Sequence, residues 1–301
     1  MLFDLQINGA LGISFTADVL TTPQVRTVAD ELARHSISAF APTVITASPE
    51  TMLASFRALA RACDEDVALF QAMPVFHMEG PYIAAEDGPR GAHPVQHVRE
   101  PSWEEFERLQ DAAGGRIKLI TLAPELPGAL DFIGRLRAAG IVVSLGHTAA
   151  TPQQIRDAAK AGAKLSTHLG NGSHAMLPRH DNYLWEQLAC DDLMASVIAD
   201  GHHLPPALLK TIIRAKGVEN VILTCDASPL AGCKPGRYSY WGAELEVAPS
   251  GRIGVAGTPY LAGSGAFLDA CVEHLTNVTG VSRTDAIAMA SANPRRLLGL
   301  T

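Results

Sequence analysis

Eight short apolar runs recur along the 301-residue chain, and segments with helical spacing separate most of them. The runs cover residues 2–7, 39–45, 73–77, 117–122, 141–145, 164–167, 194–198 and 220–224. Many of them lack the polar and apolar alternation of a half-exposed strand, which indicates strands that are covered on both faces. Eight strand–helix steps predict a parallel α/β fold, the (β/α)8 barrel of the TIM type. An open doubly wound sheet is disfavoured because the sequence has no GxGxxG or Walker phosphate turn.

A different pattern follows the eighth run. Residues 238–247 and 252–257, with a Pro-Ser-Gly turn at 249–251 between them, predict a β-hairpin inserted before a helix that begins near Ser264. A last long helix is expected after Ser282. No repeat or low-complexity linker divides the sequence, so we expect residues 1–301 to form a single domain.

The charge and cysteine content exclude several classes of protein. A balance of 24 Lys+Arg against 31 Asp+Glu gives a formal net charge of −7, which offers no general attraction for nucleic acid or anionic membranes. A small-molecule partner is therefore favoured. The 5 cysteines are scattered without paired metal-ligand spacing, as in reduced intracellular proteins. Because the sequence has no basic leader and no long apolar span, we expect a cytoplasmic protein.

Polar side chains follow the predicted strands at the points where they end. Glu79 follows the third apolar run, His147 the fifth, His168 the sixth and Asp226 the eighth. In a (β/α)8 barrel these ends meet at one mouth, where the active sites of such barrels lie. One carboxylate and two imidazoles leave a fourth position open for water, as catalytic zinc requires, although the same ligands admit iron, cobalt or manganese. A single histidine at a strand end is more often structural than a ligand, but the joint placement favours a metal site.

Asp226 completes the predicted chemistry. A bound metal lowers the pKa of a water molecule toward neutrality, and Asp226 is expected across the barrel mouth, where it takes that proton and returns it to a leaving group. The strand-end residues therefore predict a metal-dependent hydrolase.

The remaining histidines divide by position. His202 and His203 are adjacent on an extended segment and point in different directions, so we expect one to serve the site and the other to pack. His77 shares the strand face of the third-run glutamate, and we expect it to support the ligands rather than to bind. His35 and His274 lie in helical segments, where a solvated or packing role is expected.

Eight ordered segments resemble a known family, the N-acetylglucosamine-6-phosphate deacetylases of the amidohydrolase superfamily. The segments are Asp4-Leu5-Gln6-Ile7-Asn8-Gly9, His77-Met78-Glu79-Gly80-Pro81, Gly91-Ala92-His93-Pro94, Leu145-Gly146-His147, Thr167-His168-Leu169, Ala199-Asp200-Gly201-His202-His203, Thr224-Cys225-Asp226-Ala227 and Leu261-Ala262-Gly263-Ser264. A short segment such as Leu-Gly-His is a weak signal, but eight in family order across nearly the whole chain are specific together.

The resemblance implies a role for each matching residue. The implied metal ligands are Glu79, His147 and His168, and the implied general acid/base is Asp226. The implied substrate contacts are His93, Asn171 and His203.

The resemblance also implies how a phosphate is bound. Relatives use an arginine in the loop after the sixth strand, sometimes reaching in from a neighbouring subunit, and Arg179 occupies that loop here. The alternative is a solvated surface pair between Arg179 and Asp181. The resemblance therefore leaves open whether the protein forms a homodimer.

The chain departs from the family pattern in three places. The family normally carries a small β-sandwich built from both chain ends, and we expect that domain to be absent because this chain begins at the first barrel strand and stops after the last helices. Residues 172–174, Gly-Ser-His, separate Asn171 from the Ala-Met pair that commonly follows it directly, which alters the substrate loop. Gln6 and Asn8 replace the His-x-His pair of many amidohydrolases and are poor ligands, which predicts a single metal ion.

These observations lead to an expected reaction. We expect a single hydrolase barrel that removes the N-acetyl group of an amino sugar, with N-acetylglucosamine 6-phosphate as the first candidate, and releases acetate and the free amine. Two alternatives stay open: another amidohydrolase reaction, such as cyclic amide hydrolysis, or a non-catalytic barrel that binds a sugar phosphate. The presence of three ligands together with Asp226 argues against the second alternative.

Overall fold

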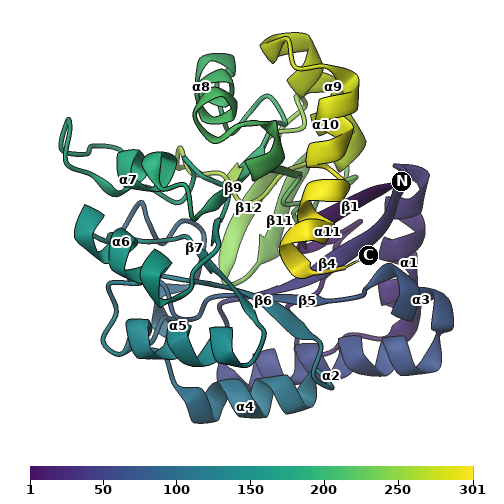
Figure 1. Ribbon diagram of the computed structural model, residues 1–301. Helices are drawn as coiled ribbons and strands as arrows, with labels where there is room; N and C mark the ends of the chain where they lie inside the picture. Colours follow the sequence, from purple (N-terminus) through teal and green to yellow (C-terminus); the bar gives the residue numbers. More distant parts are fainter. Residues whose placement is uncertain (301) are drawn as a thin grey trace.

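The computed structural model describes residues 1–300 and confirms the predicted barrel (Figure 1). Eight parallel strands follow one another in the order β1-β4-β5-β6-β7-β8-β9-β10. Their bounds are β1 (Leu2–Ile7), β4 (Ile37–Ile45), β5 (Phe76–Glu79), β6 (Ile117–Leu122), β7 (Val142–Leu145), β8 (Leu165–Ser166), β9 (Met194–Ile198) and β10 (Val221–Thr224). The ring closes where a parallel bridge joins Ile7 to Ala227 and the Asn8 N–H donates to the Ala227 carbonyl at 2.9 Å.

Helices lie on the outside of the strands (Figure 1). They are α1 (Thr22–Arg34), α2 (Pro49–Glu65), α3 (Val67–Ala72), α4 (Trp103–Ala112), α5 (Ala129–Ala138), α6 (Pro152–Ala161), α7 (Tyr183–Ala189), α8 (Pro206–Lys216), α9 (Leu268–Thr279), α10 (Arg283–Met289) and α11 (Ala292–Leu298), with 3-10 turns at Val95–His97 and Val218–Asn220. Hydroxyl caps begin several of them: Ser48, for example, accepts the Thr51 N–H at 3.1 Å ahead of Pro49. No helix within residues 1–300 is long and apolar enough to cross a membrane.

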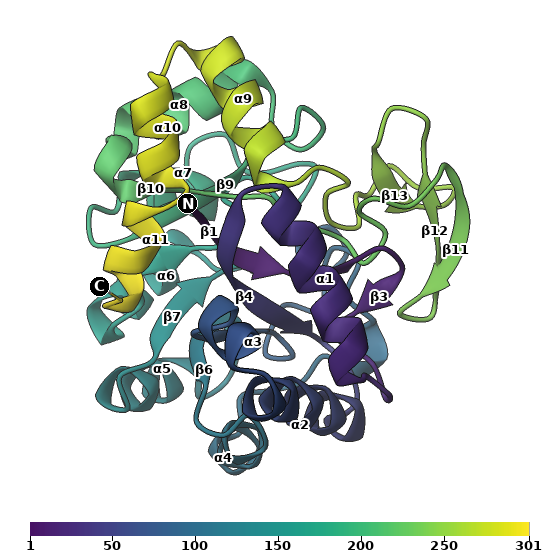
Figure 2. The same ribbon diagram turned by 90° about the vertical axis from the view of Figure 1, so that its right-hand side faces the viewer.

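The insertion after β10 differs from the predicted hairpin. It is a three-stranded antiparallel sheet of β11 (Gly236–Tyr240), β12 (Ala243–Val247) and β13 (Ile253–Val255). The run 238–247 reverses in its middle, because Trp241 and Gly242 both have positive φ, 54° and 76°, and form a tight turn. Figure 2 shows this sheet beyond the end toward which the β1 arrow points.

Two helix predictions are also corrected. The helix expected near Ser264 begins only at Leu268, because Ser264 is extended and forms a parallel bridge with Ala227. The last long helix is two short helices, α10 and α11, which a break at Ala290–Ser291 separates.

The apolar core divides into an outer layer and a plug inside the barrel. One buried cluster joins strand residues to helix residues such as Val25, Val28 and Leu32, which face the barrel. A second cluster consists almost entirely of alternate strand residues: Phe3, Leu5, Ala39, Ala41, Val75, Leu119, Leu165, Met194 and Ile222. The Arg295 guanidinium lies over the Phe3 ring, 5.2 Å from its centroid. Apolar side chains therefore fill the barrel at the end where β1 starts, and the polar residues gather at the opposite end of the barrel.

Asp4 ties the two closing strands together. Its side chain is fully buried on β1, and its carboxylate accepts the N–H groups of Gln6 (3.0 Å) and Cys225 (2.9 Å) and the hydroxyl of Thr224. Burial raises the pKa of Asp4, and these hydrogen bonds oppose that rise. The clamp fixes β10 directly before Asp226.

Replacing Asp4 with alanine is expected to lower the free energy of unfolding by about 3 kcal/mol, because it leaves buried donors on two strands without an acceptor. Urea unfolding of the variant and the wild type measures this loss. Asp30→Ala is the matched control, since Asp30 is an exposed partner of Arg26 at 3.7 Å and its loss is expected to change stability by less than about 0.5 kcal/mol. Equal stability of the two variants would contradict the assignment of Asp4 as a clamp.

Candidate metal centre and substrate cavity

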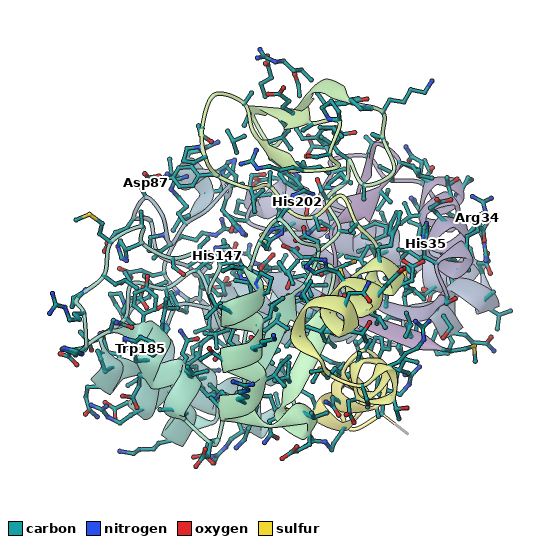
Figure 3. The ribbon with its side chains drawn as sticks, turned by 90° about the horizontal axis from the view of Figure 1, so that it is seen from above. Arg34, His35, Asp87, His147, Trp185 and His202 are labelled. Carbon is teal, nitrogen blue, oxygen red and sulfur yellow. The ribbon has the colours of Figure 1, made fainter. Side chains whose placement is uncertain are left out.

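Three side chains from separate strand ends converge at the barrel mouth. Glu79 ends β5, His147 follows β7, and His168 follows β8. Glu79 Oε1 lies 3.3 Å from His147 Nε2 and 3.1 Å from His168 Nε2, and the two Nε2 atoms are 3.1 Å apart. All three residues are buried. In Figure 3, His147 lies near the middle of the molecule seen from above, whereas Arg34 lies at its edge.

The donor set of this cluster fits a cation. His147 Nδ1 donates to the Pro89 carbonyl at 2.9 Å, so a neutral His147 carries a lone pair on Nε2. That lone pair faces the carboxylate of Glu79 and the second imidazole, an arrangement of electron-pair donors that a divalent cation satisfies. The bond from His147 to the Pro89 carbonyl is the outer-shell contact that fixes a ligating histidine in other metal sites. One carboxylate and two imidazoles in this geometry therefore form a candidate metal centre.

The environment pushes the pKa values of the two acidic residues in opposite directions. Burial opposes the charge on Glu79, but contacts with His147 and His168 hold the pKa of Glu79 well below its usual value. Burial, and then the charge of Glu79, raise the pKa of Asp226 well above its usual value. An ionised Glu79 suits a ligand, and a raised pKa suits an Asp226 that takes up a proton and gives it back during the reaction.

Left-handed backbone conformations mark this site. His147, His168 and Asp226 have φ values of 51°, 31° and 54°, which non-glycine residues adopt rarely. Such positions cost roughly 1–3 kcal/mol each and persist where the surrounding structure enforces them. At His168 that support includes a hydrogen bond from its N–H to Ser196 Oγ at 2.7 Å. Side-chain placement at these strand ends is thus held against local preference, as at other functional sites.

Two side-chain amides, one on β1 and one directly after it, donate hydrogen bonds to the carboxylates of Glu79 and Asp226. Gln6 Nε2 donates to Glu79 Oε1 at 2.7 Å, and Asn8 Nδ2 donates to Asp226 Oδ1 at 2.7 Å. The sequence predicted only that these residues are poor ligands. Their place in the structure adds that each one orients a functional carboxylate.

A cavity of about 250 Å³ opens above the cluster and brings most of the predicted site residues together. Its walls include the three candidate ligands, Asp226 and the predicted substrate contacts His93, Asn171 and His203.

His93 lies edge-on to His147, with ring centroids 4.3 Å apart, and its Nδ1 is hydrogen-bonded to Thr46 Oγ1 at 2.8 Å. Burial, and then the nearby His147, lower the pKa of His93 to about 3, so its imidazole is neutral near pH 7.

His77 lies in the barrel interior, where its Nδ1 and Nε2 contact Thr43 Oγ1 (3.2 Å) and Thr121 Oγ1 (2.8 Å). Burial lowers the pKa of His77 to about 4. His77 is therefore not part of the ligand cluster, because both of its ring nitrogens contact threonine hydroxyls in the barrel core.

The two adjacent histidines point in different directions, but His202 is exposed to solvent, whereas the sequence predicted that the histidine outside the site would pack. His203 lines the cavity, whereas His202 is exposed, with its Nε2 3.3 Å from the Ser250 carbonyl. The sequence predicted no role for Asp200, yet its carboxylate accepts His203 Nδ1–H at 2.7 Å and Ser264 Oγ–H at 3.0 Å. Burial opposes the charge of Asp200, but the contacts with His203 and two backbone N–H groups hold its pKa far below the usual value. The sequence signals for Asp200 were its position two residues after β9 and its place in one of the eight family-like segments.

Arg179 is not brought into this cavity within one chain. It is exposed in the loop between β8 and α7 and lines a second, mostly apolar cavity of about 280 Å³. Its carbonyl accepts the Trp185 indole N–H at 3.1 Å.

Hydrogen bonds connect the altered loop at residues 172–174 to other segments at the barrel mouth. His174 Nε2 donates to Glu86 at 3.0 Å, and its backbone N–H donates to the Tyr183 hydroxyl at 2.9 Å. The loop after β5 makes a second contact through the next residue, because the Tyr260 hydroxyl donates to Asp87 at 2.6 Å. Three loops at the mouth are thus linked through residues 86–87.

A (β/α)8 barrel with a carboxylate and two imidazoles at its mouth, and a further buried acid beside them, defines a metal-dependent amidohydrolase. The chain is 37% identical to the human N-acetylglucosamine-6-phosphate deacetylase, over 99% of this chain and 73% of the human protein. It is 33% identical to the N-acetylgalactosamine-6-phosphate deacetylase of Escherichia coli O157:H7, over 99% of this chain and 77% of that protein. The chain therefore belongs to the N-acetylglucosamine-6-phosphate deacetylase family, and the resemblance found in the sequence is confirmed.

Solved structures agree with this assignment. A mutant N-acetyl-D-glucosamine-6-phosphate deacetylase from Mycobacterium smegmatis, solved in complex with N-acetyl-D-glucosamine-6-phosphate, matches with a TM-score of 0.88 and 30% identity, over 99% of this chain and 77% of that chain. The N-acetylglucosamine-6-phosphate deacetylase from Thermotoga maritima matches with a TM-score of 0.87 and 27% identity, over 99% and 78% of the two chains. No family model matches the sequence.

Proposed function

We propose that the protein hydrolyses the N-acetyl group of N-acetylglucosamine 6-phosphate and releases acetate and glucosamine 6-phosphate. The observation that carries this proposal is the convergence of Glu79, His147 and His168 in one cavity with Asp226. The family supports an amide of an amino sugar as the bond that is cleaved.

The chain's own residues account for the proton movements. A divalent cation bound at the cluster would supply Lewis acidity toward water and toward the amide carbonyl. Asp226 takes a proton from the water that attacks the acetyl carbon, and it delivers a proton to the nitrogen as the C–N bond breaks. Asn8 keeps the Asp226 carboxyl in place through its 2.7 Å hydrogen bond. His93, Asn171 and His203 are proposed to contact the substrate, since all three line the cavity.

One divalent ion per chain is proposed, with zinc first and iron, cobalt or manganese as alternatives that the same ligands admit. A second ion is disfavoured because the amides of Gln6 and Asn8 already donate to Glu79 and Asp226. We propose further that residues 1–301 act as a single hydrolase domain in the cytoplasm. The 5 cysteines are all free thiols, which supports a reducing compartment.

A second candidate substrate is the 4-epimer, N-acetylgalactosamine 6-phosphate, because a relative at 33% identity is named for it. Acetate release from the two sugar phosphates and their unphosphorylated forms, measured under the same conditions, tests the proposal and ranks the candidates. Absence of acetate release from all four compounds with the metal-loaded protein would contradict it.

Arg179 is proposed to bind the phosphate from a neighbouring subunit of a homodimer. Its exposed position on the loop after β8 and the planar guanidinium fork support this role. Arg179→Ala is then expected to lower kcat/KM for the phosphorylated substrate by about 10–100-fold, the equivalent of a lost charge-assisted contact of about 1.5–3 kcal/mol. Turnover of the unphosphorylated sugar is expected to stay the same. An equal loss on both substrates, or no preference for phosphate in the wild type, would remove Arg179 from phosphate binding.

A further inference from the structure

The turn between β11 and β12 carries a residue that its backbone does not favour. Trp241 and Gly242 occupy its two central positions, and both have positive φ. Turns of this kind select asparagine, aspartate or glycine at the first central position, because a bulky side chain is strained there. A tryptophan at this position therefore needs a reason other than turn formation.

The side chain of Trp241 reaches the substrate cavity. It lines the same cavity as Glu79, His147 and Asp226, although it comes from the inserted sheet. Figure 2 shows that sheet standing near β3 (Ile13–Ser14), beyond the end of β1. The tip of the insertion thus closes one side of the barrel mouth.

The indole is held in place by its polar edge. Trp241 Nε1 donates to Ser14 Oγ at 3.4 Å, and the neighbouring Tyr240 hydroxyl is hydrogen-bonded to the Gly12 carbonyl. The ring also packs on the small apolar cluster that contains Leu230 and Ala262. Because its N–H is engaged by Ser14, Trp241 offers its apolar ring surface to whatever enters the cavity.

We propose that Trp241 is a substrate-contacting residue whose ring packs against the C–H face of the amino sugar and raises its affinity. The inference rests on the proposed function, which supplies a pyranose as the ligand. A large rigid aromatic surface adds binding energy without requiring further polar groups, and such side chains commonly line small-molecule sites. The contact lies away from the reacting amide, so it acts on binding more than on chemistry.

Kinetics of two variants test the contact. Trp241→Asn puts a residue that the turn favours in place of the indole, and it is expected to raise KM for N-acetylglucosamine 6-phosphate about tenfold with kcat within about threefold of wild type. Trp241→Phe keeps an aromatic ring and is expected to recover most of that loss. Trp103→Phe is the matched control, because Trp103 begins α4 outside the barrel, where the Arg135 guanidinium lies over its ring, and its change is expected to leave KM unaltered. A wild-type KM in Trp241→Asn, or a fall in kcat that matches the rise in KM, overturns the proposal.

Fluorescence gives a readout that does not depend on turnover. The chain has 3 tryptophans, and in a metal-loaded Asp226→Asn background the addition of N-acetylglucosamine 6-phosphate is expected to change their emission through Trp241. The change is expected to disappear with Trp241→Phe and to persist with Trp103→Phe. Persistence in the Trp241→Phe protein overturns the contact. Wild-type acetate release is measured alongside, so that a failure of the proposed function is seen separately from a failure of this inference.

Discussion

Replacing Asp226 with asparagine is expected to lower turnover of the N-acetyl amino sugar by about 10²-fold or more, because general acid/base groups contribute about that much. The amine leaves poorly unless its nitrogen is protonated, and asparagine cannot carry that proton. Metal content is expected to stay the same, since Asp226 lies outside the cluster of Glu79, His147 and His168. Steady-state acetate release and metal analysis of the purified variant measure the two quantities.

The substitution is conservative in shape. The carbonyl oxygen of an asparagine can accept the Asn8 Nδ2–H that Asp226 Oδ1 accepts at 2.7 Å, so the local hydrogen bond is retained. Loss of activity with full metal content would therefore report lost proton transfer. Near-normal turnover of Asp226→Asn would remove Asp226 from the mechanism.

Replacing His147 with alanine is expected to have the second large effect, a loss of bound metal together with a fall in turnover of about 10³-fold or more. The reason is that His147 is one of the three candidate ligands that cluster within residues 1–300, and Lewis-acid stabilisation is worth several kcal/mol. Metal analysis after dialysis, followed by acetate release, measures both. Restoration of part of the activity at high zinc concentration is expected, because two ligands remain.

His202→Ala is the matched control for the ligand variant. His202 is exposed, and its neighbour His203, not His202, lines the cavity. This control is expected to retain full metal content and turnover within about threefold of wild type, as surface substitutions usually do. Full metal occupancy in His147→Ala would contradict its role as a ligand.

The barrel could be predicted from the sequence because strands buried on both faces are read directly as apolar runs. Residues 117–122 and 194–198 match β6 and β9 in both bounds. The convergence of Glu79, His147 and His168 followed from one topological rule, that the ends of barrel strands share a mouth.

Other features depend on contacts between distant segments, which periodicity does not reveal. The role of Asp200 arises from hydrogen bonds with His203 and with Ser264, 64 residues away. The extra strand in the insertion arises because Trp241 adopts a left-handed conformation that its residue type does not predict. The position of Arg179 depends on the course of a loop that packs on α7, so its distance from the cavity could not be anticipated.

Titration of the metal-depleted wild-type protein with zinc, while acetate release from N-acetylglucosamine 6-phosphate is followed, tests the central claim most directly. We expect activity to be absent after chelation, to rise linearly with added zinc and to reach its plateau at about one equivalent per chain. Acetate release that survives chelation, that fails to appear with zinc, iron, cobalt or manganese, or that rises until a second equivalent is bound would contradict a single metal centre.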